Sequence, residues 1–163
     1  MAQFYGTEQL EKEEKEGRDK VVQYFNLIGI DKFGFPKDRY SHFDVKYITN
    51  KGNKCIGEIK MRGNDKQGIP YEYRNDMLIE KIKMYNVINI ANENGWIPTY
   101  INVYLNSNTI RFANLNDYAL TNINWRWMKM PECTFTDAGV SIEYIMKEVS
   151  YIPSHMYYQT SIV

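Results

Sequence analysis

The fold is decided by Phe43-Asp44-Val45-Lys46-Tyr47-Ile48 and by Cys55-Ile56-Gly57-Glu58-Ile59-Lys60-Met61-Arg62. Both stretches alternate with a period of two, which predicts two β-strands because successive side chains of a strand point to opposite faces. The residues between them, Thr49-Asn50-Lys51-Gly52-Asn53-Lys54, are typical of a turn. The sequence therefore predicts an antiparallel hairpin.

The more apolar side chains of both strands carry odd residue numbers. Opposite residues of an antiparallel pair point to the same side, so burying both apolar sets on one face requires odd-numbered residues to pair with odd-numbered ones. Asp44, Glu58 and Lys60 then share the other face. A two-residue turn at Lys51-Gly52 would break this register, so we expect a three- or five-residue connection or a bulge near Gly52.

Two acids and an amine on one face favour metal-assisted chemistry on a phosphate ester. Close carboxylates repel one another unless something compensates them. A set of oxygen ligands suits Mg²⁺ or Mn²⁺, which keep several waters and take one or two carboxylates. Such an ion holds a phosphodiester and lowers the pKa of a bound water, while a neighbouring lysine orients that water or stabilises developing charge. Asp44, Glu58 and Lys60 are therefore the candidate catalytic cluster.

Asp44, thirteen further residues and then Glu58-Ile59-Lys60 resemble the motif of the PD-(D/E)XK nuclease superfamily. The resemblance implies a restriction-endonuclease-like α-β-β-β-α-β core, in which helices flank a central mixed sheet. It also implies that Asp44 and Glu58 bind Mg²⁺ (or Mn²⁺), that the Ile59 carbonyl adds a metal ligand, and that Lys60 assists the water that hydrolyses DNA. Phe43 replaces the proline that names the motif.

A narrower resemblance, to a group of phage and Bacteroidetes nuclease-like proteins, rests on residues after this strand. Leu78–Tyr85 and Lys147–Pro153 carry the likeness. It implies that Glu80 and Lys83, on the helix after the strand, join the catalytic residues. A solvated i,i+3 ion pair is the alternative for these two side chains.

Two segments have helical patterns. The segment Thr7–Asn26 begins at an N-cap threonine and becomes apolar toward its end. Several branches of the superfamily carry an acid on the first helix, and both Glu13 and Glu16 fit that position. The longest helical pattern runs from about Tyr73 to Asn94, where Asn94-Gly95 stops it.

The last third of the chain is read as strands and irregular structure. Thr99–Leu105 and Thr109–Ala113 predict a second hairpin, and the aromatic-rich Trp125–Met130 precedes a late apolar stretch at Ile142–Ile152. No repeat or composition break divides the chain. We therefore expect one α/β (α+β) domain that spans residues 1–163.

Charge and composition limit the class of protein. Lys+Arg 20 balance Asp+Glu 20, so the basic signature of a protein that coats DNA is absent, whereas an enzyme with an acidic metal site remains compatible. Cys55 and Cys133 lack the spacing of a metal site or disulfide framework and indicate core thiols. There is no apolar run of membrane-spanning length and no signal-peptide pattern, so we expect a cytoplasmic protein (host cytoplasm if phage-encoded) with no membrane partner.

Basic and aromatic side chains outside the cluster are candidates for DNA contacts. Arg62, Lys66 and Arg74 flank the loop after the second strand and are candidates to hold phosphates, although loops also attract charge. Trp125 and Trp127 suit either base stacking or packing on a strand.

Three functions remain open at this level. The leading prediction is a Mg²⁺-dependent deoxyribonuclease. The second is a non-catalytic module of the same fold that binds nucleic acid or protein, and the third is a small α/β protein with a chance motif. The sequence leaves self-association into a homo-oligomer open.

Overall fold

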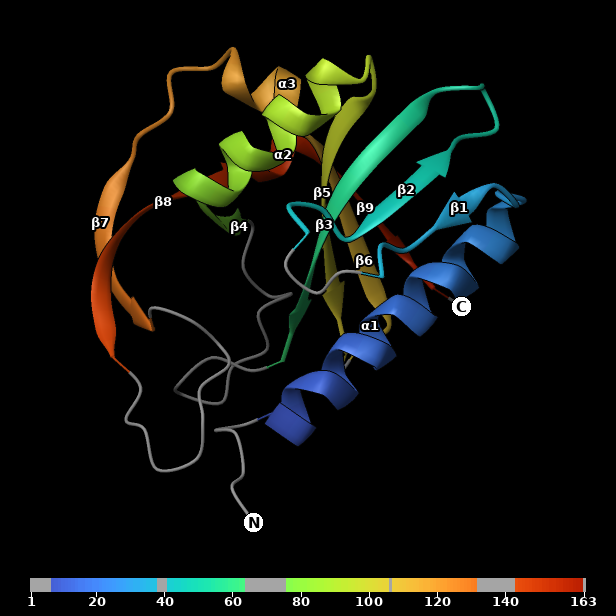
Figure 1. The fold of residues 1–163 in the computed structure, drawn as a ribbon, viewed down its shortest axis with the longest axis horizontal. Coiled ribbons are helices and arrows are strands. Elements are labelled where there is room, and N and C mark those ends of the chain that lie inside the picture. The colour runs from blue at the N-terminus through green and yellow to red at the C-terminus, as the bar shows by residue number, and fades with distance from the viewer. Residues whose placement is uncertain (1–6, 38–40, 64–75, 106, 132–142, 163) are drawn as a thin grey trace.

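The computed structural model describes residues 7–37, 41–63, 76–105, 107–131 and 143–162. Its elements are, in chain order, α1 (Thr7–Ile28), β1 (Phe33–Gly34), β2 (Val45–Ile48), β3 (Lys54–Arg62), β4 (Asp76–Glu80), α2 (Lys81–Glu93), β5 (Ile97–Tyr104), β6 (Thr109–Asn114), α3 (Leu115–Ala119), β7 (Arg126–Pro131), β8 (Tyr144–Pro153), the 3-10 helix η2 (Ser154–Met156) and β9 (Tyr157–Ser161). The protein is α+β, with a mixed sheet and helices (Figure 1), as the sequence predicts.

Six strands form the main sheet in the order β1-β2-β3-β5-β6-β9. β1, β2 and β3 form an antiparallel meander, and β6 and β9 continue the sheet in antiparallel fashion beyond β5. β5 lies parallel to β3, with Glu58 beside Tyr100 and Lys60 beside Asn102. The chain reaches β5 through β4 and α2, because a tight hairpin cannot join parallel strands.

Three strands form a second, antiparallel sheet in the order β4-β8-β7. β4 pairs with the later half of β8, where Glu80 lies opposite Val149. The earlier half of β8 continues with β7 alone. Figure 1 shows this β7–β8 ribbon on the side of the molecule away from α1.

The helix α1 packs on the odd-numbered face of β2 and β3. Val21 and Phe25 are fully buried there, in one cluster with Val45 and Ile59. The helix approaches β3 so closely at Gly17 that a Cβ at this position would collide with the thioether of Met61. Apolar burial on this face is therefore the anchor of the hairpin.

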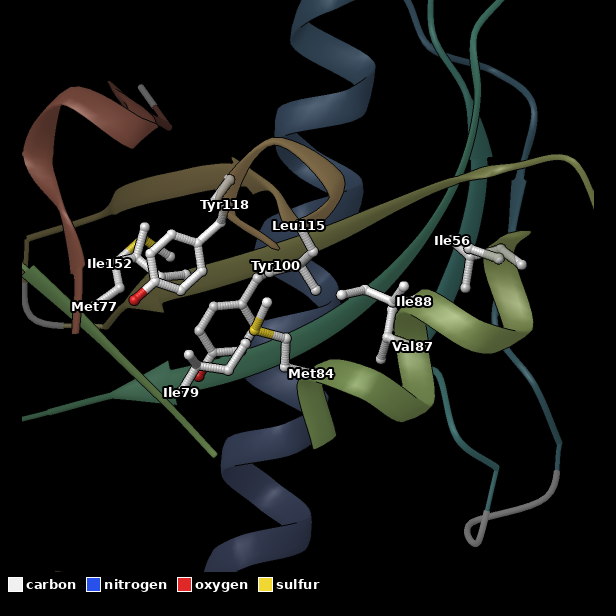
Figure 2. Packing of buried hydrophobic residues seen from close by; sticks show 12 residues of the cluster. Ile56, Met77, Ile79, Met84, Val87, Ile88, Tyr100, Leu115, Tyr118 and Ile152 are labelled. Atoms are coloured by element: carbon white, nitrogen blue, oxygen red, sulfur yellow. The ribbon is translucent and has the colours of Figure 1, made fainter. Parts of the chain in front are cut away.

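The even-numbered face of the main sheet is covered by α2, α3 and β4. Figure 2 shows Ile79 of β4 and Met84 of α2 beside the ring of Tyr100 of β5. Figure 1 shows α2 and α3 side by side and apart from α1. Among the described residues no helix has both the length and the apolar content that are needed to cross a bilayer.

The predicted register of the first hairpin is confirmed. Val45 pairs with Gly57 and Tyr47 with Cys55, so odd-numbered residues pair with odd-numbered ones. The connection Thr49–Asn53 has five residues between the paired Ile48 and Lys54. Gly52 adopts a φ of 83° in this turn, a left-handed conformation in which glycine avoids the strain of a Cβ.

The predicted helix from Tyr73 to Asn94 is wrong in its first part. Asp76–Glu80 is the strand β4, and the helix begins only at Lys81. Met77 and Ile79 are both buried, and burial of every second residue is the pattern of a strand. β8 supplies the hydrogen-bonding partner. The predicted end is correct, because α2 stops at Glu93 and Gly95 has a φ of 71°.

Candidate active site

Asp44 lies immediately before β2 and is fixed against β3. Its backbone N–H donates a hydrogen bond to the Gly57 carbonyl at 2.7 Å. Its Oδ2 accepts a hydrogen bond from the Ile59 N–H, also at 2.7 Å. Since Val45 pairs with Gly57, the next position in the ladder brings Asp44 opposite Glu58. The carboxylate of Asp44 is thus held by backbone contacts on both sides of Glu58.

Glu58 projects from the even-numbered face of β3, and its side chain is only 14% exposed. Burial, and after it the charge of Asp44, raise the pKa of this carboxyl to about 8 against the opposing pull of Lys83 and Lys60. Two neighbouring acids in a poorly hydrated place resist ionisation together. A bound cation would relieve that cost.

Lys60 lies two residues further along the same face of β3, and its pKa shifts in the opposite direction. Burial, and after it the charges of Lys83 and Arg62, lower its pKa to about 8, while Glu58 and Glu80 oppose this shift. An amine with a pKa close to neutrality exchanges a proton easily, which is the property that a group acting on a water molecule needs.

β4 and α2 bring Glu80 and Lys83 to the same site as Glu58. Lys83 Nζ lies 3.9 Å from Glu58 Oε1 and 3.8 Å from Glu80 Oε2. The attraction of Glu58 and Glu80 outweighs burial and raises the pKa of Lys83. Both residues therefore stand beside the predicted cluster, although Glu80 ends β4 and is not on the helix that the sequence predicts.

Lys147 of β8 completes this group, although the sequence analysis assigns it no role. Its Nζ lies 2.8 Å from Glu80 Oε1, and the Glu80 side chain is only 12% exposed. Burial alone would raise the pKa of Glu80, but the hydrogen bond from Lys147 and the charges of Lys83, Lys147 and Lys60 outweigh burial and lower it. The strand also carries Glu148 and Ser150, so no local pattern singles out Lys147, and its role follows only from the pairing of β8 with β4.

The residues predicted to hold a metal are only partly suited to do so alone. Among the described residues no group of three or more His, Cys, Asp or Glu side chains is arranged to hold an ion. Asp44 and Glu58 would need carbonyl, water or substrate oxygens to complete a coordination shell, and Mg²⁺ commonly binds in this way. The side chain of Ile59 is buried on the opposite face, so only its backbone is available to the site.

Arg62, predicted to hold phosphates, ties the two sheets together. Its Nε donates to Asn102 Oδ1 at 3.1 Å, and its Nη2 donates to the Leu78 carbonyl at 2.8 Å and to the Tyr100 hydroxyl at 3.2 Å. These contacts orient the guanidinium within the protein. Lys66 and Arg74, the other two predicted phosphate contacts, lie outside the described residues.

The open choice for a first-helix acid is not resolved by contacts. Glu16 is exposed on α1, and this helix covers the face of the sheet opposite to Glu58. The side chain of Glu13 lies outside the described part of the chain. Cys55 is buried and free, as predicted, whereas Cys133 is not described.

No family model matches the chain, and neither the curated proteins nor the solved structures contain a match.

Proposed function

We propose that the chain is a cytoplasmic, divalent-metal-dependent nuclease that hydrolyses phosphodiester bonds of DNA, with the fold of the PD-(D/E)XK superfamily. The order α1, β1-β2-β3, α2, β5 supports the proposal, since it follows the α-β-β-β-α-β order that the resemblance implies, with β4 inserted before α2. The observation that carries the proposal is the meeting of Asp44, Glu58 and Lys60 on one face of β3.

The donor chemistry fits a hard cation. Asp44 and Glu58 offer carboxylate oxygens, and the mutual repulsion expressed in the raised pKa of Glu58 is what a divalent ion would remove. With the Ile59 carbonyl they would hold Mg²⁺ or Mn²⁺, which supplies Lewis acidity and a water of lowered pKa.

Side chains of the protein would have the remaining roles in the reaction. Lys60 orients the attacking water and, with a pKa near 8, accepts or returns a proton during attack on phosphorus. Lys83 neutralises charge beside Glu58, and Glu80 fixes Lys83 from the other side. Lys147 is a positioning residue, because it acts on the site through Glu80.

A second function is favoured by one observation. Lys83 already lies against Glu58, so the charge of Glu58 is partly compensated without a metal. A non-catalytic module that binds nucleic acid or protein would show this arrangement too. Calorimetric titration with Mn²⁺ separates the two functions, since saturable binding that Asp44→Ala removes is required only by the enzyme.

The decisive test is cleavage of linear, circular, single-stranded and branched DNA with Mg²⁺ or Mn²⁺. Glu58→Ala and Lys60→Ala should each reduce the rate by at least about a hundredfold while the fold is retained. Glu93→Ala, which removes an exposed acid at the end of α2, is the matched control and should cleave like the wild type. Wild-type protein that cleaves none of these substrates overturns the proposal.

A further inference from the structure

One face of the β7–β8 ribbon carries a row of exposed, mostly apolar side chains. The register places Trp127 opposite Glu148, Lys129 opposite Met146 and Pro131 opposite Tyr144. Opposite residues share a face, so Trp127, Lys129, Met146 and Tyr144 line one surface, the ribbon face. Trp127 is 63% exposed, Met146 55% and Tyr144 54%.

The two tryptophans considered for base stacking differ sharply in the structure. Trp125 is half-buried, with its ring centroid 6.3 Å from that of Tyr85 and the Lys81 ammonium 5.6 Å above it. Trp127, two residues later, presents most of its indole to solvent. Packing accounts for the position of the Trp125 ring but not for that of the exposed Trp127 ring. Exposed apolar patches of this kind mark interaction sites.

We propose that the ribbon face is a stacking platform for single-stranded nucleic acid. The inference deepens the proposed function and rests on it for the class of substrate that the site receives. Aromatic faces stack on any base, and basic side chains between them contact the phosphates. On the ribbon face Trp127 and Tyr144 supply the rings, Met146 adds a polarisable apolar contact, and Lys129 supplies the charge.

The spacing and charge of the ribbon face suit this occupant. Neighbouring side chains on one face of a strand lie about 6–7 Å apart, so nucleotides laid along β7 meet Trp127 and then Lys129, and nucleotides laid along β8 meet Tyr144, Met146 and then Glu148. Of the nearby acids, Glu148 is engaged by Lys81 at 3.5 Å, and Glu143 stands exposed beside Tyr144. Lys81 thus offsets the charge of Glu148 beside Trp127.

A continuous series of contacts leads from the ribbon face to the candidate active site. Trp127 pairs with Glu148, Glu148 contacts Lys81, and Lys81 lies in the first turn of α2 with Lys83. Lys83 in turn lies beside Glu58. Contacts through the first turn of α2 therefore join Trp127 to the candidate active site, although Glu80, opposite Val149, lies on the other face of the second sheet from Glu148.

A second copy of the chain is a poorer occupant for reasons of area. Aromatic side chains bury about 150–250 Å² each when fully covered, so the exposed parts of Trp127 and Tyr144 amount to roughly 250 Å² together. A standard stable interface needs about 800 Å² from each partner. The ribbon face matches a few stacked bases better than a subunit interface.

The test measures binding of a labelled single-stranded oligonucleotide by fluorescence anisotropy in EDTA, with DNA and RNA of one sequence and with the corresponding duplex. Trp127→Ala should weaken single-strand binding by about tenfold or more, and Trp127→Phe should lose less because a ring remains. Leu120→Ala, which removes an 87% exposed apolar side chain beyond α3, should bind like the wild type. Circular dichroism verifies that each variant is folded.

Each outcome decides the inference independently of catalysis. Single-strand binding that depends on Trp127 supports the platform even if the wild type cleaves nothing. Equal binding by Trp127→Ala and wild type overturns it, even if Glu58-dependent cleavage is found. Tighter binding of the duplex, or a change in molecular mass by light scattering with binding unaffected, also overturns it, the latter in favour of a second copy as the occupant.

Discussion

The two faces of β3 differ in chemistry although their side chains alternate along one strand. Cys55 and Ile59 point toward α1 and are buried among apolar and aromatic side chains. Glu58 and Lys60, the residues on either side of Ile59, point to the other side, where burial opposes both charges. The first face gains stability from every side chain that it buries. On the second face, burial of the charged groups costs stability. Charged side chains of β4, α2 and β8 hold this face together, as is typical of functional sites.

The largest effect is expected on the apolar face. Phe25 is fully buried, with its ring 5.4 Å from Phe33 and 4.9 Å from Tyr47. Phe25→Ala should lower the free energy of unfolding by about 3–5 kcal/mol, measured by urea denaturation, because it leaves a cavity. Leu27→Ala, in the same helix but exposed, is the control. Equal losses in the two variants would show that this face is not the stabilising one.

A smaller effect of opposite sign is expected at Glu58. Its folded pKa is raised, so the stability that the protonated carboxyl contributes is present below pH 4.5 and is lost as the pH rises toward about 8. Glu58→Gln is neutral at every pH. In EDTA it should exceed the wild type in unfolding free energy by about 2 kcal/mol above pH 8, and by nothing measurable in acid. A wild type that is the more stable protein at alkaline pH would contradict the sign.

The smallest effect is expected at Lys147, which supports the charged face from outside β3. The folded pKa of Glu80 is lowered, so its stabilising contribution is present at neutral pH and is lost as the pH falls through that lowered pKa. Lys147→Met should therefore cost about 1–2 kcal/mol of unfolding free energy at neutral pH and less in acid.

Lys15→Met is the matched control for Lys147→Met. It removes a lysine that also contacts an acid, Asp19, but both side chains are exposed, and exposed pairs contribute little. If both lysine substitutions lower the thermal midpoint equally at neutral pH, the contact between Lys147 and Glu80 has no special role in holding the charged face together.

Sequence reasoning succeeded where the deciding interactions are local. The hairpin register follows from the parity of the apolar residues, and the five-residue connection is one of the forms that this register allows, so Asp44 and Glu58 could be placed together in advance. The end of α2 was visible in Asn94-Gly95. All of these features are set by residues that are close in the sequence.

Sequence reasoning failed where the partner is distant. Met77, Leu78 and Ile82 recur at helical spacing, which predicts a helix where β4 lies, although Met77 and Ile79 alternate as in a strand. A strand as short as Asp76–Glu80 is defined by its pairing with β8, which local periodicity does not contain. The role of Lys147 was missed for the same reason. β1, α3 and β9 were also not predicted, and each is only two to five residues long.

The pairing of β4 with β8 also sets an order in time as the chain is synthesised. α1, β2 and β3 have all the residues that they need once residue 62 has left the ribosome, so Asp44, Glu58 and Lys60 can gather early. Glu80 cannot meet Lys147 until β8 has followed, a delay of seconds at ordinary rates of translation. A nascent chain therefore carries Asp44, Glu58 and Glu80 before Lys147, and the charged cluster is complete only once β8 has been made.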